Sequence, residues 1–222
     1  MVEEYRTIAN AGFGEYVEKK SRFIGAVYPA KDLAEAEGYL QAARKKYYDA
    51  RHNCFACIVG EPGTPMEILR SNDDGEPGGT AGKPMLEILR GEELHCAAAV
   101  VTRYFGGTLL GTGGLVRAYS EAVRRALDTA TIATVRVGVE AHFLMEYAAA
   151  GRVRYLLEKE GFPQPELIYG QDVEVVLCIP ASALSKIRQM LTEATDGLLL
   201  EDGVFPVRYL LADGRVSEKV RL

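Results

Sequence analysis

Arg103-Tyr-Phe-Gly-Gly-Thr-Leu-Leu-Gly-Thr-Gly-Gly-Leu-Val-Arg117 joins two different hydrophobic patterns through a loop with five glycines. The preceding segment, Cys96–Thr102, has the continuous apolar character of a buried strand. After the loop, apolar residues recur at helical spacing, and the predicted helix runs from about Gly113 to Thr129. Its inward stripe comprises Leu115, Tyr119, Ala122 and Ala126. The stretch therefore predicts a strand–loop–helix unit.

This loop has the composition of an anion-binding turn. A helix start exposes unpaired N–H groups and partial positive charge, and glycine lets the backbone approach a ligand closely. Neither standard nucleotide motif fits: Thr112 stands where a Walker loop has lysine, and Val116 where a dinucleotide fingerprint has its third glycine. The alternative is a tight turn that needs its glycines for packing alone. The predicted phosphate-contacting residues are Arg103, Gly106, Gly107, Gly111, Thr112, Gly113, Gly114 and Arg117.

A second glycine-rich stretch, Ser71-Asn-Asp-Asp-Gly-Glu-Pro-Gly-Gly-Thr-Ala-Gly-Lys-Pro84, leads into a short predicted helix, Pro84–Arg90. Lys83 places a cation at this helix start, where a negative partner is needed, and we add it to the predicted phosphate-contacting set. The acids Asp73, Asp74 and Glu76 have three interpretations: they pair with the cations of the two stretches, hold Mg²⁺ with water and a phosphate, or contact a polar substrate. Their spacing does not fit an EF-hand loop.

Aromatic residues follow Arg103 directly. Tyr104 and Phe105 would suit stacking on unpaired bases while the arginine contacts phosphate, or they plug the core beside a turn. Tyr104 is included in the predicted nucleic-acid-binding set.

The cysteines and histidines predict no catalytic or metal site. Cys54 and Cys57 lie three apart on a predicted strand, so their thiols face opposite sides. His52 and Cys54 share a face but lie about 7 Å apart, too far for direct activation. We expect His95 and His142 to have no acidic or metal-ligating company and to be structural. We predict no catalytic residue, metal or cofactor.

Composition limits the class of protein. The chain has 222 residues, a net charge of −5 and four unevenly spaced cysteines, which do not suggest a disulfide framework. No apolar run approaches the ~18–20 residues of a membrane span, and acids near Met1 replace the basic start of a signal peptide. We therefore expect a cytoplasmic protein without a membrane partner, whose mild acidity argues against non-specific coating of nucleic acid.

The chain divides near residue 132, where the glycine motifs stop. We expect an α+β protein with domains at 1–132 and 133–222. The first has strands at Tyr5–Ala9, Gly14–Lys20 and Arg22–Pro29, a helix at Lys31–Tyr48, and a strand pair at Asn53–Gly60 and Met66–Ser71. The second has the order βαββαβ, which matches a ferredoxin-like domain. Its elements are Val135–Met145, Ala148–Glu160, Glu166–Gly170, Val173–Ile179, Ser182–Thr195 and Leu198–Leu211.

Both glycine-rich stretches, together with Lys19-Lys-Ser-Arg-Phe-Ile and Asp49-Ala-Arg-His-Asn-Cys, resemble the signatures of the Impact/YigZ family. The resemblance spans nearly the whole chain; the inserted Asn72 is a small departure that keeps the Asp-Asp-Gly-Glu-Pro core. It implies an N-terminal domain similar to the second domain of a small-subunit ribosomal protein and to domain IV of elongation factor G. It also implies a C-terminal ferredoxin-like domain similar to domain V of that factor.

The resemblance also implies a role in translation. Eukaryotic relatives regulate translation by competing for the activator of a starvation-response kinase, but they carry a different accessory domain, so that partner does not transfer. Bacterial members are expected to bind RNA or the ribosome. We therefore expect a non-catalytic, RNA- or ribosome-associated regulator that binds phosphate through its glycine-rich loops.

Two alternatives stay open. Small-molecule kinases share the implied N-terminal fold, so the chain could be an enzyme that acts on a nucleotide or phosphorylated small molecule with Mg²⁺. It could also be a module that binds a protein partner through the ferredoxin-like sheet.

Overall fold

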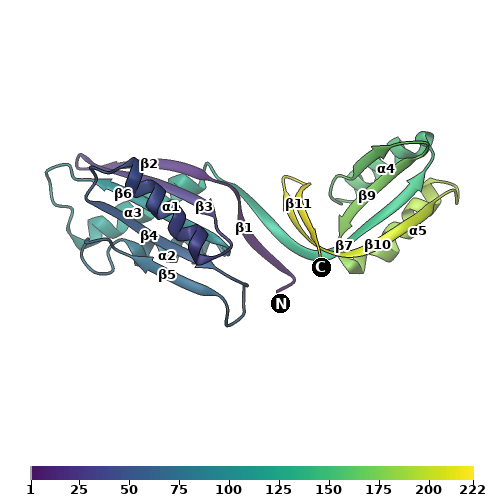
Figure 1. The fold of residues 1–222 in the computed structure, drawn as a ribbon. Helices are drawn as coiled ribbons and strands as arrows, with labels where there is room; N and C mark the ends of the chain where they lie inside the picture. Colours follow the sequence, from purple (N-terminus) through teal and green to yellow (C-terminus); the bar gives the residue numbers. More distant parts are fainter. Residues whose placement is uncertain (1) are drawn as a thin grey trace. The chain divides into compact units, whose positions relative to one another are not determined.

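The computed structural model describes residues 2–222 and divides the chain into two compact units, with the division between Ala133 and Thr134 (Figure 1). Each unit has its own sheet and its own core, so the fold is mixed α/β. The sequence predicts a division between residues 132 and 133, and the two units divide one residue later. Strand β7, Thr131–Met145, starts in the first unit and continues into the second.

The first unit is a five-stranded antiparallel sheet of order β2-β3-β6-β4-β5, with helices on both faces. In Figure 1, α1 lies on one face of this sheet, with α2 and α3 on the other. Its elements are β1 (Glu4–Asn10), β2 (Gly12–Glu18), β3 (Ser21–Pro29), α1 (Leu33–Lys46), β4 (His52–Val59), β5 (Ile68–Asn72), α2 (Gly82–Gly91), β6 (Ala97–Tyr104) and α3 (Gly111–Leu127).

Helices on both faces explain why β4 is buried along almost its whole length. Cys54 packs in the core beneath α2 and α3, whereas Cys57 packs in the core beneath α1. The expectation that these thiols face opposite sides is confirmed, and burial raises the pKa of Cys54 to about 12 and of Cys57 to about 11. A thiolate is therefore disfavoured at both positions.

The predicted helix after the glycine loop is confirmed as α3, with Leu115, Tyr119, Ala122 and Ala126 all buried. The short predicted helix is α2, two residues longer at its start than the sequence pattern indicates. The strand pair β4–β5 is antiparallel, as expected from the two segments around the turn at Glu61.

The second unit has the expected element order, βαββαβ, and one further strand. Its elements are β7, α4 (Tyr147–Lys159), β8 (Glu166–Tyr169), β9 (Val173–Ile179), a 3₁₀ turn (Ala181–Ala183), α5 (Leu184–Ala194), β10 (Leu200–Ala212) and β11 (Arg215–Arg221). Sheet order is β11-β10-β7-β9-β8, and α4 and α5 share a core with β7 and β9. Strand β11 was not predicted from the sequence. In the part of the chain that the structure describes, no helix is both long and apolar enough to span a bilayer.

Candidate functional site

The acidic loop between β5 and α2 is anchored to its own unit at every carboxylate oxygen. Asp73 accepts hydrogen bonds from the backbone N–H groups of Gly79 at 2.7 Å, Ala81 at 3.0 Å and Gly82 at 2.8 Å. Burial alone would raise the pKa of Asp73, but these three donors hold it below its ordinary value. Asp73 therefore supplies the negative partner that the start of α2 needs.

Asp74 and Glu76 have different partners. Asp74 accepts from the Asn53 backbone N–H at 2.7 Å and pairs with Arg44 at 2.6 Å. Glu76 is buried, and its carboxylate accepts hydrogen bonds from Arg103 and Tyr119. Arg103 Nη1 lies 2.6 and 2.9 Å from its two oxygens, and the Tyr119 hydroxyl lies 2.7 Å from one of them. Only Glu76 pairs with a cation of the two glycine-rich stretches, whereas Asp73 binds backbone N–H groups and Asp74 binds Arg44, which lies outside both stretches. No cluster of three or more metal-ligating side chains is found among residues 2–222.

Arg103 does not lie at an exposed phosphate site. Its side chain is 7% exposed and its charge is balanced by Glu76, whose side chain is 3% exposed. The guanidinium also lies over the rings of Phe23 and Phe105, at 5.4 and 5.6 Å from their centroids. We therefore remove Arg103 from the phosphate-contacting set and assign it to the core.

The Tyr104 side chain is also hydrogen-bonded within its own unit. Its hydroxyl donates to Asp49 at 2.7 Å, which raises the pKa of Tyr104 to about 12, and its ring meets Tyr47 edge-on. The neighbouring Phe105 is the more exposed ring, with 52% of its surface accessible. If an aromatic side chain of this loop stacks on a base, the geometry favours Phe105 over Tyr104.

The N-terminus of α3 matches the predicted anion site more closely. Within the described residues no side chain caps this helix, and its first turn holds no acid. Gly111, Thr112 and Gly113 are exposed, and the first N–H groups of an α-helix have no partner within the helix. A Cβ built on Gly113 would lie 3.7 Å from Arg117 Nη1, so the guanidinium folds back beside the first turn.

The loop itself packs against a lysine pair that the sequence analysis did not include in the site. Gly106 donates to Ser21 Oγ at 3.1 Å, and a Cβ on Gly106 would come within 2.0 Å of the Lys20 carbonyl carbon. Lys19 and Lys20 form the exposed β2–β3 turn, both with positive φ. In the sequence they are recognisable only as two adjacent lysines just before β3. Their position beside the glycine loop follows from the tertiary fold.

The remaining predicted residues divide between packing and surface. Gly114 is buried against Leu110, so it serves packing, whereas Gly107 is exposed with a φ of +85°. Lys83 is exposed in the first turn of α2, with no ion-pair or hydrogen-bond partner in the described part of the chain, although Asp73 already caps that helix.

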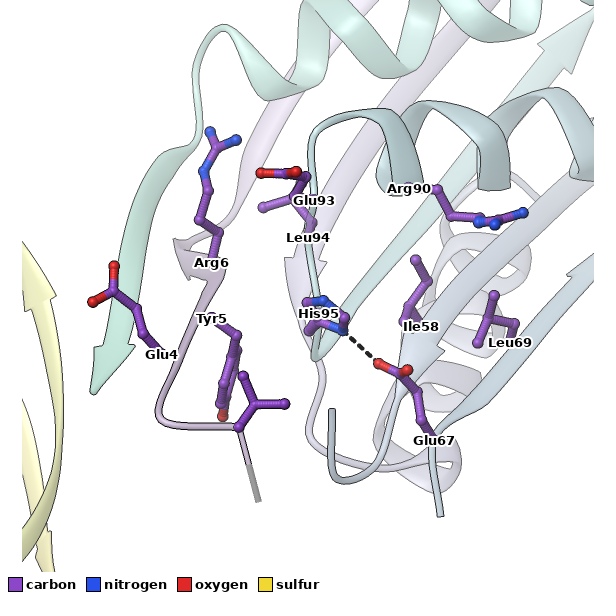
Figure 2. Close-up of a pocket in the computed structure, with 11 residues that line it drawn as sticks. Glu4, Tyr5, Arg6, Ile58, Glu67, Leu69, Arg90, Glu93, Leu94 and His95 are labelled. Carbon is purple, nitrogen blue, oxygen red and sulfur yellow. Dashed lines mark hydrogen bonds and ion pairs between the residues drawn. The ribbon is translucent and has the colours of Figure 1, made fainter. Parts of the chain in front are cut away.

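A separate hollow of about 590 Å³ lies between β1, β5 and the segment after α2 (Figure 2). In it, His95 Nδ1 bonds the Glu67 carboxylate, and the Tyr5 ring meets the imidazole edge-on (Figure 2). The hollow contains none of the predicted phosphate-contacting residues.

His95 and His142 both contact glutamates, so the expectation that these histidines lack acidic partners is wrong. Besides the His95–Glu67 pair, His142 contacts Glu174 at 2.6 Å and Glu140 at 3.0 Å. Glu67 and Glu174 come from other strands or loops, 28 and 32 residues away, which sequence neighbours could not reveal.

Comparisons with known proteins cover both units. The Impact N-terminal domain family matches residues 19–127, and a domain of unknown function, DUF1949, matches residues 144–198. The Bacillus subtilis (strain 168) IMPACT family member YvyE is 36% identical over 197 residues, covering 89% of both chains. The Escherichia coli (strain K12) IMPACT family member YigZ is 47% identical over 113 residues, covering 51% of this chain and 55% of its own. A crystal structure described as a hypothetical protein aligns with a TM-score of 0.59 and 33% identity, covering 90% of this chain and 97% of that one.

Proposed function

Since the chain belongs to the Impact family, we propose that it is an RNA- or ribosome-associated regulator of translation. The proposed contact surface, which we call the α3 surface, comprises the helix start and three cations: Gly111–Gly113, Arg117, Lys19 and Lys20. Phosphate oxygens would accept hydrogen bonds from the open N–H groups of α3, and Phe105 would stack on an unpaired base. We also propose that the first unit is similar to domain IV of elongation factor G and that the second unit is ferredoxin-like.

One observation carries this proposal: α3 begins with no cap and no acid, beneath an arginine that folds toward its first turn. The contrast with α2 is direct, because Asp73 caps that helix from within the chain. At an exposed helix start water satisfies the free N–H donors, but a cation beside them is unfavourable without a negative partner. Phosphate supplies both the charge and the acceptors.

The enzyme alternative gains no support from the acidic loop, because every oxygen of Asp73, Asp74 and Glu76 has a partner inside the unit. A Mg²⁺ site there would have to displace backbone donors, Arg44 or the buried Arg103. The RNA proposal needs no such rearrangement.

Filter binding of a short single-stranded RNA over a salt series tests the proposal. We expect affinity to fall as salt rises, and each lysine or arginine removed from the α3 surface to reduce the salt slope by about one. Arg117→Met with Lys20→Met should weaken binding at least about tenfold at low salt. Arg124→Met, an exposed arginine near the other end of α3, is the matched control and should bind like the unmodified protein. Equal affinity of the double variant and the control would contradict the proposal.

A further inference from the structure

The C-terminal end of α1 gathers cations and tyrosine rings, in a chain whose net charge is −5. Lys45 and Lys46 are exposed in the last turn of the helix, and neither forms an ion pair with another described residue. Tyr47 and Tyr48 follow directly, and Tyr48 is 85% exposed. Cations by themselves suit the negative end of a helix dipole, but the dipole does not account for a bare aromatic ring beside them. We call these four residues the α1-end surface.

A row of side chains on β3, β6 and α1 connects the α1-end surface to the β2–β3 turn. Lys20 lies in that turn, beside the glycine loop. Arg22 stands opposite Tyr104 in the β3–β6 ladder, which places their side chains next to each other on one face of the sheet. The Tyr104 ring lies 6.5 Å from the Tyr47 ring, and Lys46 Nζ lies 5.0 Å from the centroid of the latter. The α1-end surface is therefore continuous with the lysines of the α3 surface.

The charge along this row favours an anionic ligand. Arg22 is paired with Glu15 at 2.7 Å. The acids Glu18 and Asp49 each accept a hydrogen bond from a tyrosine hydroxyl, at 2.9 and 2.7 Å. Four lysines, two at each end of the row, stand against these two carboxylates, and none of the four has a carboxylate partner among the described residues. The excess of positive charge suits a chain of phosphates.

Exposed rings at the two ends of the row favour a single strand over a duplex. Tyr48 is the exposed ring at the end of α1, and Phe105, which is 52% exposed, is the one beside the glycine loop. An unpaired base can stack on such a ring whatever its sequence. In a duplex the bases are stacked inside the helix, and a protein meets mainly phosphates and 2′-hydroxyls. A cationic row with a ring at each end therefore fits single-stranded RNA.

We propose that single-stranded RNA runs from the α3 surface across the β2–β3 turn to the α1-end surface. There Lys45 and Lys46 contact phosphates, and the Tyr48 ring stacks on an unpaired base. This inference rests on the proposed function, to which it adds a second contact region and a preference for single strands over duplexes. The variants that test it leave the α3 surface unchanged.

Filter binding of a single-stranded RNA of about 12 nucleotides tests the α1-end surface. Lys45→Met with Lys46→Met should weaken binding at least about tenfold at low salt and reduce the salt slope by about one to two. Tyr48→Ala should weaken binding at least about fivefold with the slope unchanged, because the ring carries no charge. The matched controls are Lys31→Met, just before the start of α1, and Tyr155→Ala, an exposed tyrosine of the second unit. Both should bind like the unmodified protein.

Tryptophan fluorescence gives a second readout that does not depend on a loss of affinity. The chain contains no tryptophan, so Tyr48→Trp introduces a single reporter at the proposed stacking position. The single-stranded RNA should quench this fluorescence until it saturates, because a base stacks on the indole ring. An RNA duplex of the same length should leave the fluorescence unchanged.

Two results would overturn this inference. One is affinity within about twofold of the unmodified protein for both Tyr48→Ala and the double lysine variant, with no quenching of Tyr48→Trp. The other is equal quenching by the single strand and the duplex. In either case the proposed function stands if Arg117→Met with Lys20→Met still weakens RNA binding, and fails as well if that variant binds normally.

Discussion

Replacing Glu76 is the sharpest test of how the first unit is held together. Glu76→Ala leaves Arg103 buried without its counterion and the Tyr119 hydroxyl without its acceptor. Breaking a buried ion pair from one side costs about 3–5 kcal/mol, because the remaining charge stays desolvated. The Arg103 Nε is already buried without a partner, so little local compensation is available among the described residues. We expect the free energy of unfolding of this unit to fall by about 3–5 kcal/mol.

Native-state hydrogen exchange, measured on peptides from β6 and α3, reports that loss within the first unit. About 3 kcal/mol corresponds to a rise of roughly two decades in the exchange rate of the slowest amides. Glu76→Gln keeps an acceptor but leaves the buried Arg103 charge without its counterion, so it should cost less than Glu76→Ala but still clearly more than breaking an exposed pair. Glu76→Leu with Arg103→Met should recover most of the loss, because no unpaired charge remains.

Glu121→Ala is the matched control, since Glu121 forms an exposed pair with Arg125 one turn along α3. It should cost no more than about 0.5 kcal/mol. A loss below about 1 kcal/mol for Glu76→Ala would refute the assignment of Arg103 to a buried structural pair, since such pairs cost several times more to break.

Three further predictions concern the cap of α2, the glycine loop and the second unit. Asp73→Ala should destabilise the first unit by about 1–2 kcal/mol in urea unfolding, because it removes the cap of α2. Gly106→Ala should shift the amide resonances of Lys20 and Ser21, because its Cβ would collide with that backbone. The second unit should be most stable between about pH 5 and 6.5 in thermal unfolding. Below this range Glu140, whose pKa is lowered to about 2, loses its contribution as it protonates. Above it His142, whose pKa its two glutamates raise despite burial, loses its contribution as it deprotonates. Glu140→Gln should flatten the acid side of that profile.

Local patterns predicted most elements because those elements bury one periodic face. The helix after the glycine loop and the strand pair around Glu61 were both recognisable from spacing alone. Strand β11 was missed because Arg215–Arg221 is polar and mostly exposed, and its partners lie on other strands. A polar strand that is mostly exposed leaves no hydrophobic alternation to detect.

The candidate site was predicted in part. The glycine loop and Arg117 could be identified because a cation beside a glycine-rich helix start is unfavourable without a negative partner. Whether Arg103 was free or paired depended on Glu76, 27 residues away, and only the fold brings them together. Lys20 belongs to a segment that resembles a family motif, but its contact with Gly106 follows from sheet pairing that no local pattern specifies.

The amide resonances of the α3 start test the central claim most directly. In a titration of the ¹⁵N-labelled protein with a short single-stranded RNA at low salt, the N–H signals of Gly111, Thr112 and Gly113 should shift progressively and saturate. The signals of Ala81 and Gly82, at the start of α2, should stay in place because Asp73 already occupies their donors. Shifts confined to other surfaces, with the α3 start unmoved, would contradict phosphate binding at this helix.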